Sequence, residues 1–393
     1  MASLPLQGIT VVTIEQAVAG PLATRHLADL GARVIKIERP DGGDFARGYD
    51  DSVKGLSSWF VWLNRSKESL TLDVKRDQAR DVIERLLQRA DVFIQNLAPG
   101  ATDRLGLGTD ALRSRYPALI VCNISGYGSS GPHADKKAYD LLVQSEVGLL
   151  SITGTDRTPC KVGVSIADIS AGMYAYSGIL TALLTRKDTG KGTAVDVALL
   201  DTLGEWMSYA AYYTHYSGTQ PPRTGASHAT IAPYGPYRTS DGVVVIAIQN
   251  NREWAQFCAS VLEQPAVGGD ARFESNVLRV RNRAALDAEI EAVLSRLSSV
   301  EAVQRLDAAK IANARLNSVR EYVEHPQLTA RDCWREVDSP AGPLRALIPP
   351  VRMDGVEPVM GAVPALGQHS RAILEEIGFD AATIDKWSGA GII

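Results

Sequence analysis

The sequence predicts an α/β protein with a Rossmann-like large domain and a smaller α+β domain. In the first third of the chain, short runs of β-branched residues alternate with helix-forming segments, as in proteins with a parallel sheet. At 393 residues the chain exceeds the size at which a single core usually keeps growing. After about residue 214 a loop-rich segment interrupts the alternation, which indicates the start of a second domain.

A βαβ unit opens the chain. Residues 9–14 are rich in β-branched side chains, residues 19–30 form a helix that Gly31 stops, and residues 33–38 form a second strand. The alternation continues with strands at 70–74, 91–95, 119–124 and 194–198 and helices at 78–89 and 199–213.

The later part of the chain has a different pattern. Residues 215–235 are loop-rich, and a hairpin-like turn at 237–242 precedes a strand at 243–248. Amphipathic helices are expected at 252–262, 283–297 and 300–310. The tail, residues 340–367, is rich in Pro and Gly with short strands, and a final helix covers 370–377.

Residues 161–174 contain the main candidate for chemistry. A strand-like run at 162–166 leads into a helix-like run that continues to Leu184, and Asp168 lies at their junction. A carboxylate favours a helix start, because it accepts hydrogen bonds from free amides and meets the positive end of the helix dipole. It can equally act as a covalent nucleophile at a strand-to-helix turn. The local pattern leaves both interpretations open.

Composition excludes several functional classes. The chain is 45% apolar and 22% charged with a formal charge of −4, so it has no nucleic-acid footprint. The four cysteines are widely spaced without a C-x-x-C pair, which indicates reduced thiols rather than a disulfide frame or a metal site. The N-terminal residues lack a secretory pattern and no apolar run is long enough to span a bilayer. We expect a cytoplasmic protein with no membrane partner.

The turn after the first strand disfavours a dinucleotide ligand. Residues 15–21 lack the three spaced glycines that let a backbone approach a pyrophosphate, although Glu38 ends the second strand where a ribose-binding acid would lie. Basic residues stand beside the expected cleft instead. Together they suit a phosphorylated ligand that is not a dinucleotide. They are Arg39, Lys67, Lys75, Arg104, Lys136 and Lys137.

With these features the chain resembles the family III coenzyme A (CoA) transferases, the group that includes formyl-CoA transferase and carnitine CoA-transferase. The matching segments run nearly from end to end. They are residues 6–12, 19–21, 30–39, 64–75, 96–106, 139–144, 163–174, 190–192 and 364–370.

The resemblance implies an interlocked homodimer in which residues 1–214, rejoined by 330–393, form the large CoA-binding domain and 215–329 form the small one. It implies that Asp168 is the nucleophile, forming a mixed anhydride and then an enzyme–CoA thioester. Gln16 and Ala17 would donate hydrogen bonds to an oxyanion or acyl group. No permanently bound cofactor is implied, because the CoA thioester is a substrate. The implied CoA contacts are Arg39, Leu72, Lys75, Asn96, Arg104 and Lys137, with Leu72 against the adenine.

The segment 225–235 is expected to act as a lid that keeps water out, although it has fewer glycines than the family's usual glycine run. Polar and basic residues suit a second carboxylate on the acceptor acid. They are Tyr139, Arg223, His228 and Arg238. We therefore expect a small dicarboxylate system, such as succinyl-CoA with itaconate, mesaconate or citramalate.

Two alternatives remain open. The first is an α-methylacyl-CoA racemase, a group with the same fold whose members carry a His-Asp pair that aligns with Tyr139-Asp140. A tyrosine, with an unperturbed pKa of ~10, is a poor base at neutral pH, which disfavours this alternative. A non-catalytic CoA-binding protein would not need the carboxylate of Asp168. Serine or metal hydrolase motifs are absent, since the sequence contains neither G-x-S-x-G nor H-E-x-x-H.

Overall fold

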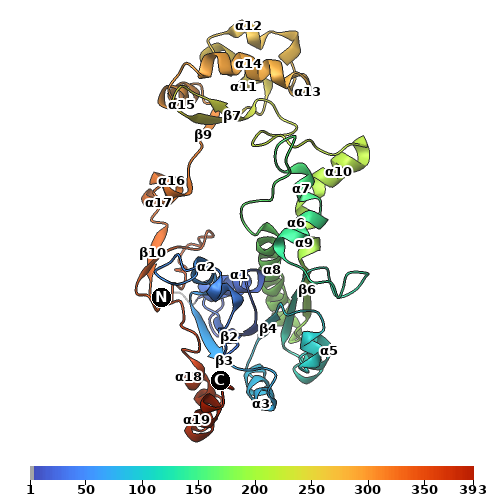
Figure 1. The fold of residues 1–393 in the computed structure, drawn as a ribbon, viewed down its shortest axis with the longest axis vertical. Coiled ribbons are helices and arrows are strands. Elements are labelled where there is room, and N and C mark those ends of the chain that lie inside the picture. The colour runs from blue at the N-terminus through green and yellow to red at the C-terminus, as the bar shows by residue number, and fades with distance from the viewer. Residues whose placement is uncertain (1–3) are drawn as a thin grey trace. The chain divides into compact units, whose positions relative to one another are not determined.

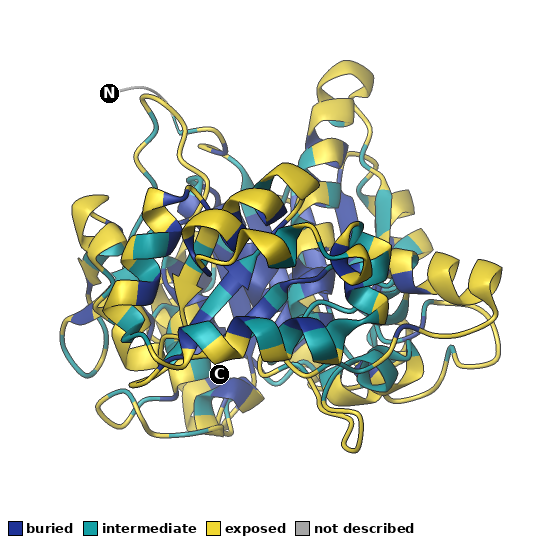
Figure 2. Cartoon of the chain, turned by 90° about the horizontal axis from the view of Figure 1, so that it is seen from above, coloured by how far each residue is buried: buried dark blue, intermediate teal, exposed yellow. Residues whose placement is uncertain are grey.

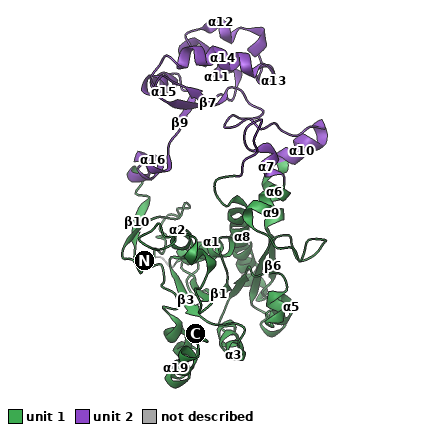
Figure 3. Ribbon diagram, in the orientation of Figure 1, with its two compact units in different colours: residues 1–147, 162–208, 330–393 green, residues 148–161, 209–329 purple. Residues whose placement is uncertain are grey.

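Two units make up the computed structural model, which describes residues 4–393 (Figure 1). Unit 1 consists of the chain up to Val147, residues 162–208 and residues 330–393, and unit 2 consists of residues 148–161 and 209–329 (Figure 3). The division implied by the resemblance differs by assigning 148–161 and 209–214 to the large domain. The sequence's first three residues, part of the N-terminus that we expect to lack a secretory signal, lie outside the described range.

Unit 1 is built on a six-stranded sheet in the order β3-β2-β1-β4-β5-β6, in which every neighbouring pair is parallel. This confirms the predicted α/β class. Since the strand order changes direction between β1 and β4, the sheet has its switch point there, where such folds bind ligands. The strands are β1 (Thr10–Ile14), β2 (Arg33–Glu38), β3 (Lys67–Thr71), β4 (Val92–Gln95), β5 (Ile120–Ser125) and β6 (Ala194–Ala198).

Helices cover this sheet, and the buried residues lie both on the strands and on helices such as α1 and α8 (Figure 2). Alternate residues of a strand face opposite sides, and Val12 and Ile14 share one core with side chains of α3, α5, α18 and α19. Elsewhere in unit 1, α1 packs against α8, which also contacts β5 and β6.

The helices of unit 1 are short apart from α8. They are α1 (Ala19–Asp29), α2 (Ser58–Asn64), α3 (Asp77–Leu87), α4 (Ala101–Arg104), α5 (Thr109–Arg115), α6 (Asp140–Glu146), α8 (Ile166–Thr189), α9 (Leu199–Trp206), α18 (Ser370–Glu376) and α19 (Ala381–Gly389), with a 3₁₀ turn η1 at Phe45–Gly48. The strands β10 (Trp334–Val337) and β11 (Leu344–Leu347) pair antiparallel.

Unit 2 has an antiparallel sheet of β7 (Tyr234–Arg238), β8 (Val243–Ala247) and β9 (Ala312–Arg315). A separate core forms where this sheet meets α11, α14 and α15. The helices are α7 (Leu149–Ile152), α10 (Ser208–Ser217), α11 (Asn251–Ser260), α12 (Pro265–Gly268), α13 (Asn276–Arg281), α14 (Arg283–Leu294), α15 (Ser299–Ala308), α16 (Val319–Val323) and α17 (Pro326–Ala330), with a 3₁₀ turn η2 at Ala271–Phe273.

The predicted strand at 162–166 is wrong. Its residues form no strand, because the Val162 N–H donates to the side chain of Gln144 rather than to another strand. Helix α8 begins at Ile166, so Asp168 lies in the first helical turn rather than at a strand end.

Other boundaries also differ from prediction. Strand β3 begins three residues before the predicted 70–74, because Lys67 and Glu68 pair with Val34 and Ile35 despite their charges. The single helix predicted at 199–213 is two helices that meet at Met207. The helix predicted to be final is followed by α19. Within residues 4–393, none of the helices combines the length and the apolar character needed to cross a membrane.

Candidate active site

The turns that follow β1 and β4 are tied together at the switch point of the sheet. The Gln16 N–H donates to Oδ1 of Asn96 at 2.8 Å, and Nδ2 of Asn96 donates back to the Gln16 carbonyl at 2.8 Å. Gln16 and Asn96 therefore form a reciprocal pair at the carboxyl edge of two adjacent parallel strands, where a ligand is expected.

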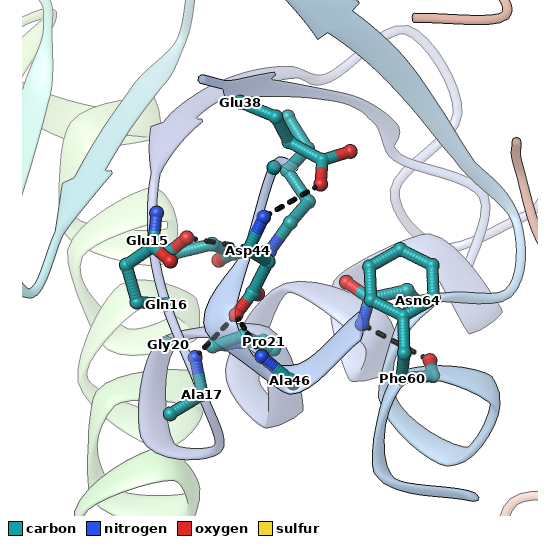
Figure 4. Close-up of polar contacts among 12 residues, drawn as sticks. Glu15, Gln16, Ala17, Gly20, Pro21, Glu38, Asp44, Ala46, Phe60 and Asn64 are labelled. Carbon is teal, nitrogen blue, oxygen red and sulfur yellow. Dashed lines mark hydrogen bonds and ion pairs between the residues drawn. The ribbon is translucent and has the colours of Figure 1, made fainter. Parts of the chain in front are cut away.

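The 3₁₀ turn η1 holds the same segment from a second direction (Figure 4). The Ala17 N–H donates to Oδ1 of Asp44 at 2.9 Å, and the Phe45 N–H donates to Oε1 of Gln16 at 3.0 Å. Ala17 has a positive φ of 62°, a conformation that is costly for a residue with a Cβ and that the surroundings must maintain.

These contacts limit the oxyanion role implied for Gln16 and Ala17. Their backbone amides already donate to Asn96 and Asp44. Nε2 of Gln16 makes no hydrogen bond to any residue in the range 4–393. Of the two residues, only Gln16 thus has a donor available for a substrate, and this donor is its side-chain amide.

A fully buried ion network lies beneath this turn. Glu15 contacts Nζ of Lys67 at 2.8 Å and Nζ of Lys36 at 3.4 Å, and Lys36 also reaches Asp44 at 2.7 Å. Burial opposes the charge on Glu15, but the two lysines outweigh it and hold the pKa of Glu15 below its usual value. Burial lowers the pKa of Lys67 to about 8 against the attraction of Glu15. The basic Lys67 is therefore internal and is not free to bind a phosphate.

The start of α8 is capped by another carboxylate, Asp140. The Ala167 N–H donates to Oδ1 of Asp140 at 2.8 Å, and Nε2 of Gln144 donates to Oδ2 at 2.7 Å. Gln144 in turn accepts the Val162 N–H at 3.0 Å. The Ala167 amide in the first turn of α8 is thus satisfied by α6, without Asp168.

The carboxylate of Asp168 is half-buried and makes no hydrogen bond or ion pair within the described residues. Burial, with the negative charge of Asp140, raises the pKa of Asp168 to about 7. A carboxylate that served as a helix cap would accept an amide hydrogen bond and have a lowered pKa. Asp168 has neither property, so the helix-cap interpretation does not explain it.

Close helix packing brings Asp168 toward the turn after β1. A Cβ on Gly172 of α8 would lie 2.7 Å from the Ala19 carbonyl oxygen of α1, so the two helices approach each other at a glycine. Ile169 packs against the small apolar cluster that includes Ala17 and Val18. The side-chain amide of Gln16 and the carboxylate of Asp168 therefore belong to one region of unit 1.

Tyr49 belongs to the same region but was not identified from the sequence. Its pKa is raised by burial and by the charges of Asp44 and Asp168. Its ring is half-exposed and meets Trp59 edge-on at 6.2 Å. The sequence carried no signal for it, because a tyrosine in a loop has no distinctive pattern.

The implied CoA contacts fall into two groups. Lys75, Arg104 and Lys137 are exposed, and Arg39 lies over the ring of Phe45 at 4.9 Å while donating to the Gly43 carbonyl. These four remain candidates for phosphate contacts.

Two other implied contacts are less accessible. Leu72 is 1% exposed within the core, so its side chain is not available to the adenine in this structure. Asn96 uses both side-chain atoms on Gln16.

The residues expected to bind the acceptor acid differ in their availability. Tyr139 of unit 1 is 70% exposed, just before α6. In unit 2, the guanidinium of Arg238 is exposed and has no ion-pair or hydrogen-bond partner among the described residues. His228 stacks on Tyr234 with ring centres 5.2 Å apart.

Arg223 is committed elsewhere. Its guanidinium donates to the backbone carbonyls of Ser151, Thr155 and Asp156 at 3.2, 2.8 and 3.0 Å. It ties two loops of unit 2 together and is not free to hold a substrate carboxylate.

The segment expected to act as a lid is anchored within unit 2. Arg283 donates to the carbonyls of His228 and Ile231, and Asn276 donates to the carbonyl of Thr230 at 2.8 Å. Opening of this loop alone would break these bonds. A lid role would require movement of the segment together with the rest of unit 2.

Unit 1 thus presents an α/β site in which the helix that carries an unpaired carboxylate packs against the turn at the switch point of a parallel sheet. Across residues 4–393, no group of three or more His, Cys, Asp or Glu side chains is arranged to hold a metal ion.

Comparison with known proteins identifies the family. Residues 6–370 match the family model described as CoA-transferase family III, and the chain belongs to that family. It is 32% identical to a succinyl-CoA:glutarate CoA-transferase of Mus musculus, over 99% of this chain and 90% of the relative. It is also 32% identical to a succinyl-CoA:mesaconate CoA-transferase of Haloarcula marismortui, over 96% and 98% of the two chains.

A solved structure agrees with this assignment. The crystal structure of a CaiB/BaiF family protein from Brucella suis is 34% identical, covers 96% of this chain and all of its own, and superposes with a TM-score of 0.84. The resemblance stated from the sequence is therefore confirmed, and the chain is an enzyme of the CoA-transferase class.

Proposed function

We propose that this enzyme transfers CoA from succinyl-CoA, or a similar acyl-CoA, to a small dicarboxylic acid, with Asp168 as the nucleophile. The observation that carries the proposal is the unpaired carboxylate of Asp168, whose pKa of about 7 leaves a substantial ionised fraction at neutral pH. The names of the relatives support a donor and an acceptor of this size.

The reaction would proceed through three covalent forms of Asp168: an anhydride with the donor acid, a thioester with CoA and an anhydride with the acceptor acid. The carboxylate attacks the thioester carbonyl, which breaks the carbon–sulfur bond, releases the CoA thiolate and leaves a mixed anhydride. The thiolate then attacks the aspartyl carbonyl, releasing the donor acid and forming an enzyme–CoA thioester. The acceptor carboxylate attacks the aspartyl carbonyl of that thioester, which releases the CoA thiolate and forms a second mixed anhydride between the acceptor and Asp168. The thiolate then attacks the acceptor acyl carbon of this anhydride, which yields the acceptor's CoA thioester and regenerates the Asp168 carboxylate. The side-chain amide of Gln16 would stabilise the oxyanions.

The site supports the racemase alternative less well. A racemase needs two opposed acid–base groups, and Asp140 is committed to capping α8 while Tyr139 is a weak base. Exchange of the α-proton of an acyl-CoA in deuterated water, without CoA transfer, would favour it.

We also propose that the enzyme acts as an interlocked homodimer in the cytoplasm. Large apolar side chains are exposed on α8 and α10, which suits burial against a second copy. These side chains include Met173, Tyr174, Leu184, Tyr212 and Tyr216. The four cysteines are free thiols, which suits the cytoplasm.

The function is tested by incubating the enzyme with succinyl-CoA and separate C4 to C6 dicarboxylates, and by measuring new acyl-CoA species by mass spectrometry. We expect turnover with at least one dicarboxylate and much slower turnover with monocarboxylates of equal length. Succinyl-CoA that stays intact with every acid, or is only hydrolysed, would argue against the proposal.

The pH dependence of the reaction should follow Asp168. The nucleophile must be ionised, so kcat/KM for the acyl-CoA should rise through an apparent pKa near 7. Part of the rise in the pKa of Asp168 comes from the charge of Asp140. Asp140→Asn should therefore move the rising part of the pH–rate profile to lower pH, while the side-chain amide can still accept the Ala167 N–H. A profile that stays in place would remove Asp140 as a cause.

Arg238 is a better candidate than Arg223 to bind the distal carboxylate of the acceptor acid, because the guanidinium of Arg223 is already bonded to backbone carbonyls. Arg238→Ala should raise the KM for the dicarboxylate by about tenfold or more, since a charge-assisted contact is worth roughly 1.5–3 kcal/mol. Arg252→Ala, which removes another exposed arginine of unit 2, is the matched control. An unchanged KM for Arg238→Ala would exclude this role.

A further inference from the structure

The side chain of Gln16 is held in one orientation by groups outside its own strand and turn. Asn96 fixes its backbone through two hydrogen bonds of 2.8 Å. The Phe45 N–H occupies Oε1 at 3.0 Å. With the carbonyl oxygen of the amide taken, Nε2 is the end that remains for another molecule.

Asp44 fixes the next residue and is itself fixed. Its Oδ1 accepts the N–H groups of Ala17 and Ala46 at 2.9 Å, and its Oδ2 contacts Nζ of Lys36 at 2.7 Å. Asp44 is 1% exposed. The carboxylate therefore holds Ala17 at its positive φ and also orients the turn from which Phe45 reaches Gln16.

We propose that Asn96 and Asp44 are positioning residues that hold the side-chain amide of Gln16 toward the acyl group attacked by Asp168. Asn96 then acts through Gln16 and not as the CoA contact that the resemblance implies. The inference rests on the proposed function, because the aimed amide matters only if an acyl oxyanion forms beside it. The physical reason is that a donor stabilises an oxyanion only within a narrow range of distances and angles.

A double-mutant cycle tests the proposal. Asn96→Ala should lower kcat by about 10²-fold, the order of loss expected for misplacement of a catalytic group by ~1 Å, with little change in KM for the acyl-CoA. In a Gln16→Ala background the same change should lower kcat by less than about twofold, because no aimed amide remains to be lost. Asp44→Asn, which keeps an acceptor for the Ala17 N–H but removes the charge paired with Lys36, should show the same dependence on Gln16 with a smaller loss.

A matched control separates positioning from general loss of an asparagine. Asn123 within β5 also uses its carboxamide fully, bonding to Gln95, Thr109 and Asp196 but not to Gln16. Asn123→Ala should keep kcat within about threefold of the native value, as expected for a residue that does not act through Gln16.

Hydrogen exchange supplies a readout that does not depend on activity. In Asn96→Ala the amide of Gln16 loses its acceptor, so exchange in a peptide covering residues 14–18 should accelerate by about fivefold or more. Peptides from β5 and β6 should be unchanged.

Three results would overturn the inference. A higher KM for the acyl-CoA at unchanged kcat would make Asn96 a CoA contact, and an equal loss of kcat with and without Gln16 would make its effect independent of that residue. An inactive native enzyme would instead reject the proposed function, while unchanged exchange in Asn96→Ala would separately reject the hold on Gln16.

Discussion

Asp168→Asn is expected to lower the rate of CoA transfer by about 10⁴-fold or more, in the range seen when a covalent nucleophile is removed. The carboxamide has nearly the same shape but cannot form an anhydride. The native enzyme incubated with succinyl-CoA and then hydroxylamine should carry a hydroxamate on the peptide that contains Asp168. Mass spectrometry should find the peptide of the variant unmodified.

Two controls make this result specific. Asp201→Asn changes an exposed aspartate in the first turn of α9 and should retain most of the activity. Asp168→Asn should also melt no lower than the native enzyme at pH 8. Since the folded-state pKa of Asp168 is raised to about 7, stability falls as the pH rises from the ordinary carboxyl pKa to about 7, and the full cost is present at pH 8; the amide avoids this cost. A variant that folds and transfers CoA at the native rate would reject Asp168 as the nucleophile.

Glu15→Ala is expected to destabilise unit 1 by about 3–5 kcal/mol, because it leaves a buried lysine without its anionic partner. Lys36 keeps Asp44, whereas Lys67 would retain only the Pro21 carbonyl and Asn64 as hydrogen-bond acceptors. For a unit of this size the melting temperature should fall by roughly 10 °C, measurable by calorimetry.

Glu376→Ala serves as the control for this change. Glu376 pairs with Arg33 on the surface, where its side chain is 44% exposed, so its loss should cost less than about 1 kcal/mol. Equal destabilisation by the two substitutions would show that burial of the Glu15 network has no special effect on stability.

The alternation of apolar runs predicted the fold class because parallel strands and their crossover helices carry distinct periodicities along the chain. It failed where a long-range contact outweighed local pattern. Strand β3 begins at Lys67, whose ammonium group forms a buried ion pair with Glu15. Judged from its neighbours in sequence alone, a charged residue at that position predicts a loop.

The candidate nucleophile shows the same division. Residues 163–174 were enough to point to Asp168 through the family resemblance, but the local pattern explained an aspartate at a helix start equally well. The distinction came from Asp140, which caps α8 from the start of α6 and leaves Asp168 without a partner.

By itself, the sequence determined the α/β class, the family and the position of one carboxylate, since each depends on residues that are adjacent or regularly spaced. Only the tertiary structure decided which polar groups are already engaged. The guanidinium of Arg223 donates to backbone carbonyls, and Leu72 is buried in the core. Asn96 and Asp44 both accept hydrogen bonds from the turn after β1. Hydrogen-bond partners 27 and 80 residues apart have no signature in local pattern, because their meeting depends on how strands and helices pack.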